Sequence, residues 1–165
     1  MVTFTKTFTK TVPPNPNPSP ETGVAEITET DVLRVFHNPG EMISLNPLVS
    51  KFEALDPSKP NLYTVHDGLN VLGVFKVDIA YTVEFDLTTD GTDNKVLAGA
   101  GTTLVEKWRV SKKDDGTGQL EISETVTVEC FFLFYPFILA TMSGAHKRLL
   151  EILVEKLEKE KKEGS

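Results

Sequence analysis

An unbroken alternation of apolar and polar side chains runs through residues 75–87 (FKVDIAYTVEFDL). Such alternation predicts a long β-strand with one buried face, because successive side chains point to opposite sides of a sheet. Something apolar must cover that face. Residues 137–162 can do so, since they contain no proline and carry their apolar side chains on one side of a helix. We therefore expect one long C-terminal helix over an antiparallel sheet, with a cavity between them.

Length, charge and cysteine content limit the class of protein. At 165 residues the chain is most simply a single domain, residues 1–165. Its 17 Lys and Arg against 24 Asp and Glu argue against nucleic-acid binding. No apolar run is long enough to span a membrane, and the N-terminus alternates where a signal peptide would be continuously apolar, so we expect no stable membrane insertion. The lone Cys130 excludes a disulfide framework and favours a cytoplasmic protein.

The predicted elements are a strand, two short helices, six strands and the long helix. The first strand covers residues 2–12, and the Pro-rich loop at 13–20 follows it, because proline has no amide donor. Capping residues place the short helices at about 28–37 and 39–45. The six strands are expected at about 48–55, 61–67, 74–88, 94–101, 102–111 and 118–132. Residues 158–165 mix both charges and are expected to be a fraying, charged tail.

Two motifs and this order of elements carry a resemblance to known proteins. Residues 40–49 read GEMISLNPLV and residues 104–108 read LVEKW. They resemble the START-like and polyketide-cyclase superfamily, and more narrowly a fungal family of START-like domains of unknown function. The resemblance implies an α+β helix-grip fold, in which a seven-stranded curved antiparallel sheet, two short helices and a long C-terminal helix enclose a cavity. It also implies a small hydrophobic ligand or substrate.

A histidine falls inside the apolar sector of the predicted long helix. On a helical wheel, His146 shares this sector with Met142, Ala145, Leu149, Ile152, Leu153 and Leu157. A histidine ring can donate or accept a proton near neutral pH, and burial would lower its pKa and favour a base. The alternative is a core histidine that is hydrogen-bonded to a strand residue.

Two glutamates occupy the apolar phase of neighbouring strands. Glu106 shares its phase with Trp108, and Glu124 shares its phase with Ile122. Pairing Trp108 with Ile122 would set the two glutamates directly opposite each other, with Cβ atoms about 5 Å apart. Two like charges in a pocket would raise at least one pKa and create a general acid or a shared-proton pair. A bulge between Ala98 and Thr103, where Gly99 and Gly101 favour one, would instead swap the faces of the upstream strand. An inward glutamate could also simply pair with Arg34 or Arg109.

These patterns define the candidate site. The candidate catalytic residues are His146, Glu106 and Glu124. The candidate ligand-binding residues are Met42, Tyr63, Phe75, Tyr81, Phe85, Trp108, Met142, Ala145 and Leu149. The chain has no phosphate-binding glycine motif, zinc-ligand spacing or nucleophilic-serine motif, so we expect no metal and no cofactor.

Three functions stay open. The first is binding of a small hydrophobic molecule, with cofactor-independent cyclisation, isomerisation or dehydration of a polyketide or terpenoid in fungal secondary metabolism. The second is a non-catalytic carrier or sensor of lipids or sterols. The third is a protein-interaction module. A large apolar cavity with convergent polar groups favours catalysis, a smooth cavity favours carriage and a filled one favours interaction. The sequence specifies neither the ligand nor the oligomeric state.

Overall fold

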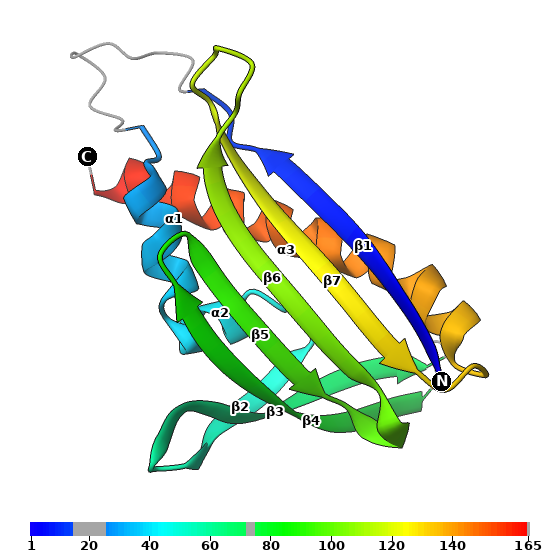
Figure 1. Ribbon diagram of the computed structural model, residues 1–165. Helices are drawn as coiled ribbons and strands as arrows, with labels where there is room; N and C mark the ends of the chain where they lie inside the picture. The colour runs from blue at the N-terminus through cyan, green and yellow to red at the C-terminus, as the bar shows by residue number, and fades with distance from the viewer. Residues whose placement is uncertain (15–25, 72–74, 165) are drawn as a thin grey trace.

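The computed structural model describes residues 1–14, 26–71 and 75–164, and it describes the side chains of these residues except 69–71 and 75–77. Most of the predicted Pro-rich loop at 13–20 therefore lies outside the described residues. The elements are β1 (Val2–Thr11), α1 (Glu29–Phe36), α2 (Pro39–Ser44), β2 (Val49–Asp56), β3 (Lys59–Val71), β4 (Phe75–Thr88), β5 (Gly91–Leu97), the 3₁₀ turn η1 (Gly99–Gly101), β6 (Thr103–Lys112), β7 (Leu120–Cys130) and α3 (Tyr135–Glu163) (Figure 1).

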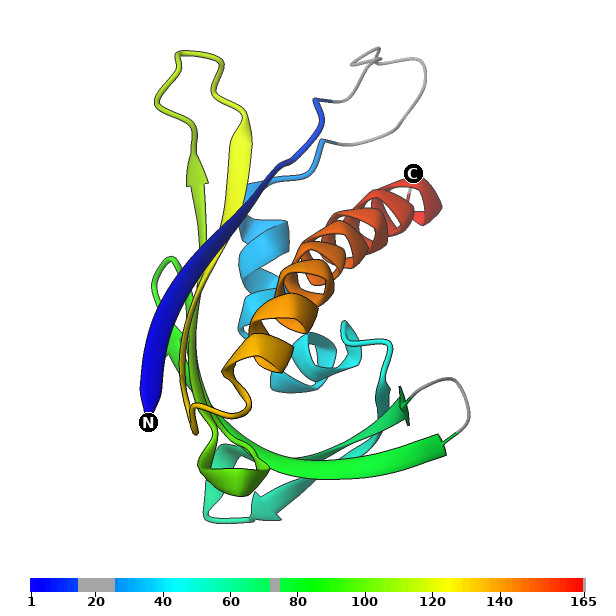
Figure 2. The ribbon, with the colours of Figure 1, turned by 90° about the vertical axis from the view of Figure 1, so that its right-hand side faces the viewer.

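The strands form one antiparallel sheet of seven, in the order β1-β7-β6-β5-β4-β3-β2. The sheet is curved, and α1, α2 and α3 all lie on its concave side (Figure 2). Strand β1 pairs with β7, so the first and last strands of the chain are neighbours at one side of the sheet. The predicted α+β helix-grip fold is confirmed.

Local capping chemistry explains where the two short helices begin. The Thr28 hydroxyl accepts a hydrogen bond from the Asp31 amide at 3.3 Å, and the Asp31 carboxylate accepts one from the Thr28 amide at 2.7 Å. This reciprocal pair is a capping box at the start of α1. Helix α2 begins at Pro39, where the Asn38 side chain caps the Glu41 amide at 3.2 Å. The two helices begin where the sequence predicted.

Helix α3 lies across the concave face and supplies much of the core. Its buried residues are Met142, His146, Leu150, Leu153, Val154 and Leu157. The helical wheel therefore placed His146 correctly but missed Leu150 and Val154. The helix continues through the segment expected to fray, and Lys161 near its end lies 2.8 Å from the Asp31 carboxylate of α1.

The pairing of β6 with β7 differs from the predicted register by two residues. Trp108 lies opposite Glu124, whereas the prediction set it opposite Ile122, and Glu106 lies opposite Val126. A shift of two residues keeps every side chain on its face, because side chains alternate with a period of two. The two glutamates thus point to the same side but are offset diagonally.

Glycines shape the turns that set this register. Residues 99–101 were predicted to end a strand, but they form the 3₁₀ turn η1. The chain therefore reverses direction between β5 and β6 at these residues, in place of the bulge that was considered. Gly116 and Gly118, with φ of 78° and 70°, build the β6–β7 turn in a conformation that favours glycine. At Gly91 a Cβ atom would lie 1.8 Å from the Trp108 carbonyl oxygen, so only glycine allows β5 to approach β6 this closely.

Candidate functional site

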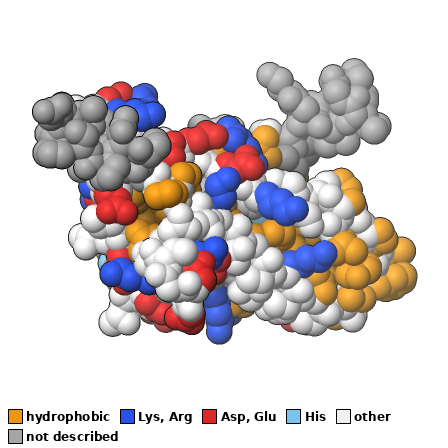
Figure 3. All heavy atoms as spheres, turned by 90° about the horizontal axis from the view of Figure 1, so that it is seen from above, with side chains coloured by type: hydrophobic (Ala, Val, Ile, Leu, Met, Phe, Trp, Pro, Cys, Tyr) orange, Lys and Arg blue, Asp and Glu red, His pale blue; other side chains and the backbone are white. Residues whose placement is uncertain are grey.

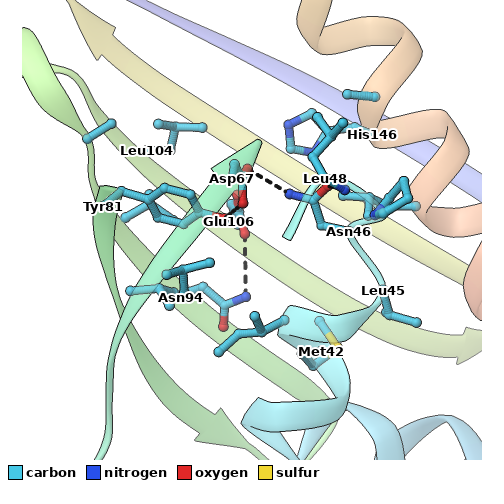
Figure 4. Close-up of a pocket in the computed structure, with 18 of the residues that line it drawn as sticks. Met42, Leu45, Asn46, Leu48, Asp67, Tyr81, Asn94, Leu104, Glu106 and His146 are labelled. Carbon is cyan, nitrogen blue, oxygen red and sulfur yellow. Dashed lines mark hydrogen bonds between the residues drawn. The ribbon is translucent and has the colours of Figure 1, made fainter. Parts of the chain in front are cut away.

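A cavity of about 500 Å³ lies between the sheet, α2 and the N-terminal half of α3 (Figure 4). Its wall is mainly apolar and aromatic, and includes Met42, Val65, Phe85, Leu104, Trp108 and Leu149. Ala145 lines it too, yet is exposed, which places the mouth of the cavity along this edge of α3. A cavity of this size and composition suits a small organic molecule.

His146 is fixed by two contacts. Its Nδ1 lies 2.7 Å from Oε1 of Glu124, which is fully buried. Its ring stacks on Phe8 of β1, with ring centroids 5.5 Å apart and planes 8° from parallel. The residue itself is only 8% exposed, and it lines the cavity. The ring is therefore held from one side by Glu124 and from another by Phe8.

Burial decides the protonation of this pair. It raises the pKa of Glu124 well above the ordinary glutamate value and lowers the pKa of His146. Both shifts favour the uncharged forms, a carboxylic acid at Glu124 and a neutral imidazole at His146, and in that state the Glu124 hydroxyl donates the hydrogen bond to Nδ1. The other ring nitrogen, Nε2, then carries the ring proton and is a hydrogen-bond donor.

Glu106 is the second acidic group at the cavity. Burial is the largest cause that raises its pKa to about 7. Asn94 of β5 donates a hydrogen bond to its Oε2 at 3.4 Å, and the Thr92 hydroxyl donates to the Asn94 carbonyl at 3.0 Å. Glu106 is half-buried and lines the cavity. With this pKa it is present in both protonation states at neutral pH.

A further polar cluster on the cavity wall joins Tyr81, a candidate ligand-binding residue, to Asp67 and Asn46, which the sequence reasoning missed. Asp67 of β3 accepts hydrogen bonds from Asn46 at 3.0 Å and from the Tyr81 hydroxyl at 3.2 Å. Burial raises the pKa of Asp67, and burial and the Asp67 charge raise the pKa of Tyr81. Asp67 shares its strand phase with the buried Val65, which is the same signal that drew attention to Glu106.

The candidate catalytic residues converge in space. One carboxyl oxygen from each of Glu106 and Glu124 and one ring nitrogen of His146 all lie within 4.8 Å of one another. Among the described residues no other group of His, Cys, Asp and Glu comes together in this way. A direct hydrogen bond already joins His146 to Glu124, so we interpret the cluster as an acid–base group, and the expectation of no metal stays a prediction.

The candidate ligand-binding residues divide into three sets. Those that line the cavity are Met42, Tyr81, Phe85, Trp108, Ala145 and Leu149. Tyr63 and Met142 are not among the lining residues: the Tyr63 ring packs edge-on against Phe85 at 6.1 Å, and Met142 is buried in the core. The side chain of Phe75 lies outside the described part of the chain.

Comparison with models of known families shows which family the chain belongs to. The model of the family described as "Domain of unknown function (DUF7053)" matches residues 5–159, nearly the whole sequence. The chain belongs to the DUF7053 family. A search of curated proteins finds no match.

Solved structures show how widely this DUF7053 fold is shared. Norcoclaurine synthase from Thalictrum flavum, crystallised with a transition-state analogue, aligns with a TM-score of 0.63 at 15% identity, over 97% of each chain. The ZhuI aromatase/cyclase from Streptomyces sp. R1128 aligns with a TM-score of 0.63 at 12% identity, over 95% of this chain and 94% of that one. A conserved protein from Geobacillus kaustophilus gives 0.62 at 12% identity, over 99% and 97%. At such identities the likeness establishes the START-like fold of the DUF7053 chain.

Among the described residues, no helix combines the length and apolar character needed to cross a membrane.

Proposed function

We propose that this protein binds a small hydrophobic molecule in the cavity and moves a proton within it. The reaction would be a cofactor-independent cyclisation, isomerisation or dehydration of a polyketide or terpenoid. The observation that carries the proposal is the convergence of Glu106, Glu124 and His146 within 4.8 Å at a cavity whose wall is otherwise mainly apolar. Titratable groups with perturbed pKa values in a concave apolar site are typical of acid–base catalysis.

The roles follow from the protonation states. Ionised Glu106 accepts a proton from a carbon next to a ligand carbonyl. His146 donates its Nε2 proton to the carbonyl oxygen while Nδ1 takes the proton of Glu124. The negative charge thus moves from Glu106 to Glu124 and an enol forms. Returning the proton at another carbon gives an isomer, attack of the enol carbon on a second carbonyl closes a ring, and loss of a neighbouring hydroxyl as water gives a dehydrated product.

Confinement in the cavity supplies the rest of the rate enhancement. A flexible apolar chain loses most of its conformations in an enclosed cavity of about 500 Å³, and this brings its reacting atoms together. Acid–base catalysis typically contributes roughly 10²- to 10⁴-fold beyond such confinement. The norcoclaurine synthase and the aromatase/cyclase with the same fold support an enzymatic use of the cavity.

A carrier or sensor of lipids or sterols is the second candidate function. It is favoured by the hydrogen bond between His146 and Oε1 of Glu124, which forms without a ligand. In that case the polar groups only anchor a ligand hydroxyl.

Exposed apolar residues favour a third candidate, a protein-interaction module. Figure 3 shows hydrophobic side chains gathered at the right-hand end of the molecule, where α3 begins in Figure 1. Phe132, Leu133 and Phe137 in this region are 56%, 66% and 65% exposed. An exposed patch of this kind is typical of interaction surfaces.

The proposed setting is the cytoplasm of a fungus, in secondary metabolism. This part of the proposal is supported only by the motifs at 40–49 and 104–108 and by the single, buried Cys130.

A comparison of three proteins tests the function. The parent, His146→Ala and the control His66→Ala are incubated with a metabolite extract of the source organism, and bound molecules are identified by native mass spectrometry. His66 is a suitable control because it alternates with Val65 and so faces away from the cavity. Conversion of a metabolite by the parent and the control but not by His146→Ala is the expected result. A ligand retained with unchanged mass by all three proteins would establish a carrier, and no retained small molecule would contradict both functions.

A further inference from the structure

Carboxyl groups outnumber cations at the cavity. Asp67 and Glu106 line it, and Glu124 lies directly behind His146. Arg148 is the only lysine or arginine among the described lining residues. Its guanidinium group lies 3.1 Å from Glu151 and 2.9 Å from Glu155, so its charge is already balanced on the outside of α3. The described cavity therefore contains acids without an available positive partner.

Aromatic rings surround these acids. Tyr81, Phe85 and Trp108 all line the cavity, and the Trp108 side chain is almost fully buried. The faces of such rings attract organic cations, and most strongly so where water is excluded. The hydrogen bond from Asn94 to Glu106 is long, at 3.4 Å, which leaves the carboxylate able to accept a stronger donor. The wall thus combines two features that recognise an alkylammonium group.

We propose that the ligand of this cavity is an amine with an apolar body, whose ammonium group is bound by the carboxylate of Glu106. Asp67 is a second carboxylate on the cavity wall, and the Tyr81 hydroxyl lies 3.2 Å from it. The inference rests on the proposed function in one respect, since both use the same cavity. Because Glu106 cannot pair with an ammonium group and accept a proton from carbon at the same time, the inference adds the charge of the bound ligand and not a step of the reaction.

Other ligand charges fit less well. A carboxylate ligand would add a further negative group to a cavity that has no available cation. A metal ion would contact only the acidic side chains, and it would leave the apolar part of the wall without a ligand. The net charge of −7 also attracts cationic molecules to this protein over longer distances.

Binding of the amine should depend on pH. The titratable and charged groups at the cavity are Asp67 on β3, Tyr81 on β4, Glu106 on β6, Glu124 on β7, and His146 and Arg148 on α3. An ammonium group favours the ionised form of Glu106, so binding below neutral pH must release a proton from this residue. The affinity for an amine is therefore expected to rise between about pH 6 and pH 8, and the affinity for a neutral alcohol of the same shape is expected to stay constant.

Three probes of nearly the same shape test the ligand charge: 4-phenylbutylamine, 4-phenyl-1-butanol and 4-phenylbutyrate. Trp108 is the only tryptophan in the chain, so its fluorescence reports directly on the cavity. Titrations contain EDTA, which removes free metal ions. At pH 7.5 the amine is expected to bind at least about tenfold more tightly than the alcohol, a difference of about 1.4 kcal/mol. The carboxylate is expected to bind most weakly.

Two substitutions complete the test. Glu106→Gln is expected to abolish the advantage of the amine, because its affinity should fall at least about tenfold more than the affinity for the alcohol. Glu84→Gln, which changes an exposed glutamate of β4, is the matched control and is expected to keep the advantage. Equal binding of amine and alcohol by the parent, or tightest binding of the carboxylate, would overturn the inference while the apolar cavity stands. If none of the three probes binds, the inference and the proposed binding of a hydrophobic molecule both fail.

Discussion

Acidic side chains near the two ends of helix α3 have pKa values that are shifted in opposite directions. Near its C-terminus, burial alone would raise the pKa of Asp31, but hydrogen bonds from Lys161 and Thr28 outweigh it and lower the pKa. The same holds for Glu41 of α2, where Lys156 and Arg34 overcome the effect of burial. The acids of this region are ionised and paired, and they join α3 to the two short helices.

Near the N-terminal half of α3, the acids have no such partners. Burial raises the pKa of Glu106 to about 7 and raises that of Glu124 well above its usual range, and it lowers the pKa of the neighbouring His146. In this comparison, the acids with a Lys or Arg at hydrogen-bonding distance have lowered pKa values, and the acids without one have raised values. At one end of the helix, ion pairs attach it to α1 and α2. At the other end, burial favours the uncharged forms of Glu124 and His146 and raises the pKa of Glu106 to about 7.

Removing His146 should have the largest effect. His146→Ala leaves Glu124 buried without its hydrogen-bond partner, and we expect a loss of about 2–4 kcal/mol in the free energy of unfolding. Urea unfolding followed by circular dichroism measures this loss, with His66→Ala as the control, which should cost less than about 1 kcal/mol. Equal losses in the two variants would show that the hydrogen bond to Glu124 contributes nothing.

Glu106→Gln should change how stability depends on pH. The pKa of Glu106 is raised in the folded protein, so its contribution is present below the unfolded value of 4.5 and is lost as the pH rises through about 7. Because glutamine does not ionise, we expect the variant to gain roughly 1–3 kcal/mol relative to the parent between pH 5 and pH 8. Urea unfolding at the two pH values gives the difference, and parallel pH profiles for parent and variant would contradict the raised pKa.

Glu41→Gln should have a smaller effect of opposite sign. The pKa of Glu41 is lowered, so its contribution is present above the unfolded value of 4.5 and is lost as the pH falls below it. Its carboxylate lies 3.0 Å from Arg34 and 3.2 Å from Lys156. These pairs are partly exposed, so we expect a loss of about 0.5–1 kcal/mol at pH 7. The loss should shrink in 0.5 M salt; a salt-independent loss would contradict an ionic origin.

The smallest expected effect comes from a comparison of two tyrosines, only one of which lines the cavity. Tyr81 lines the cavity, whereas Tyr63 is not among the lining residues. Tyr81→Phe removes a hydroxyl beside Asp67 and should weaken binding of 4-phenylbutylamine about two- to fivefold, which is less than 1 kcal/mol. Tyr63→Phe should leave the affinity unchanged. Trp108 fluorescence titrations measure both, and an equal loss in the two variants would mean that the effect does not arise in the cavity.

Much of the site could be predicted because it depends on short-range periodicity. Glu106 and Glu124 interrupt the apolar phase of their strands, and His146 interrupts the apolar sector of its helix. Period-two and 3.6-residue patterns place such residues on the inner face. Asp67 and Asn94 interrupt their strands in the same way, next to Val65 and Val96, so the same signal was available for them.

Tyr63 shows what the phase of a residue in a strand cannot predict. It shares its strand phase with Asp67 and packs against Phe85, but it stops short of the cavity wall. Sequence phase specifies the face of a sheet, not the distance of a side chain from a cavity, because that distance depends on how the sheet curves.

By itself, the sequence determined the order of the elements, the helix caps and the inward direction of Glu124 and His146, because these depend on neighbours within a few residues. The face of Glu106 stayed open, since an upstream bulge would have reversed it. The tertiary structure alone decided which groups meet. The two-residue shift in the pairing of β6 with β7 sets Glu124 opposite Trp108, and the position of α3 brings His146 to within 2.7 Å of Glu124. Strand register and helix position result from packing between segments far apart in the chain, and no local pattern encodes them.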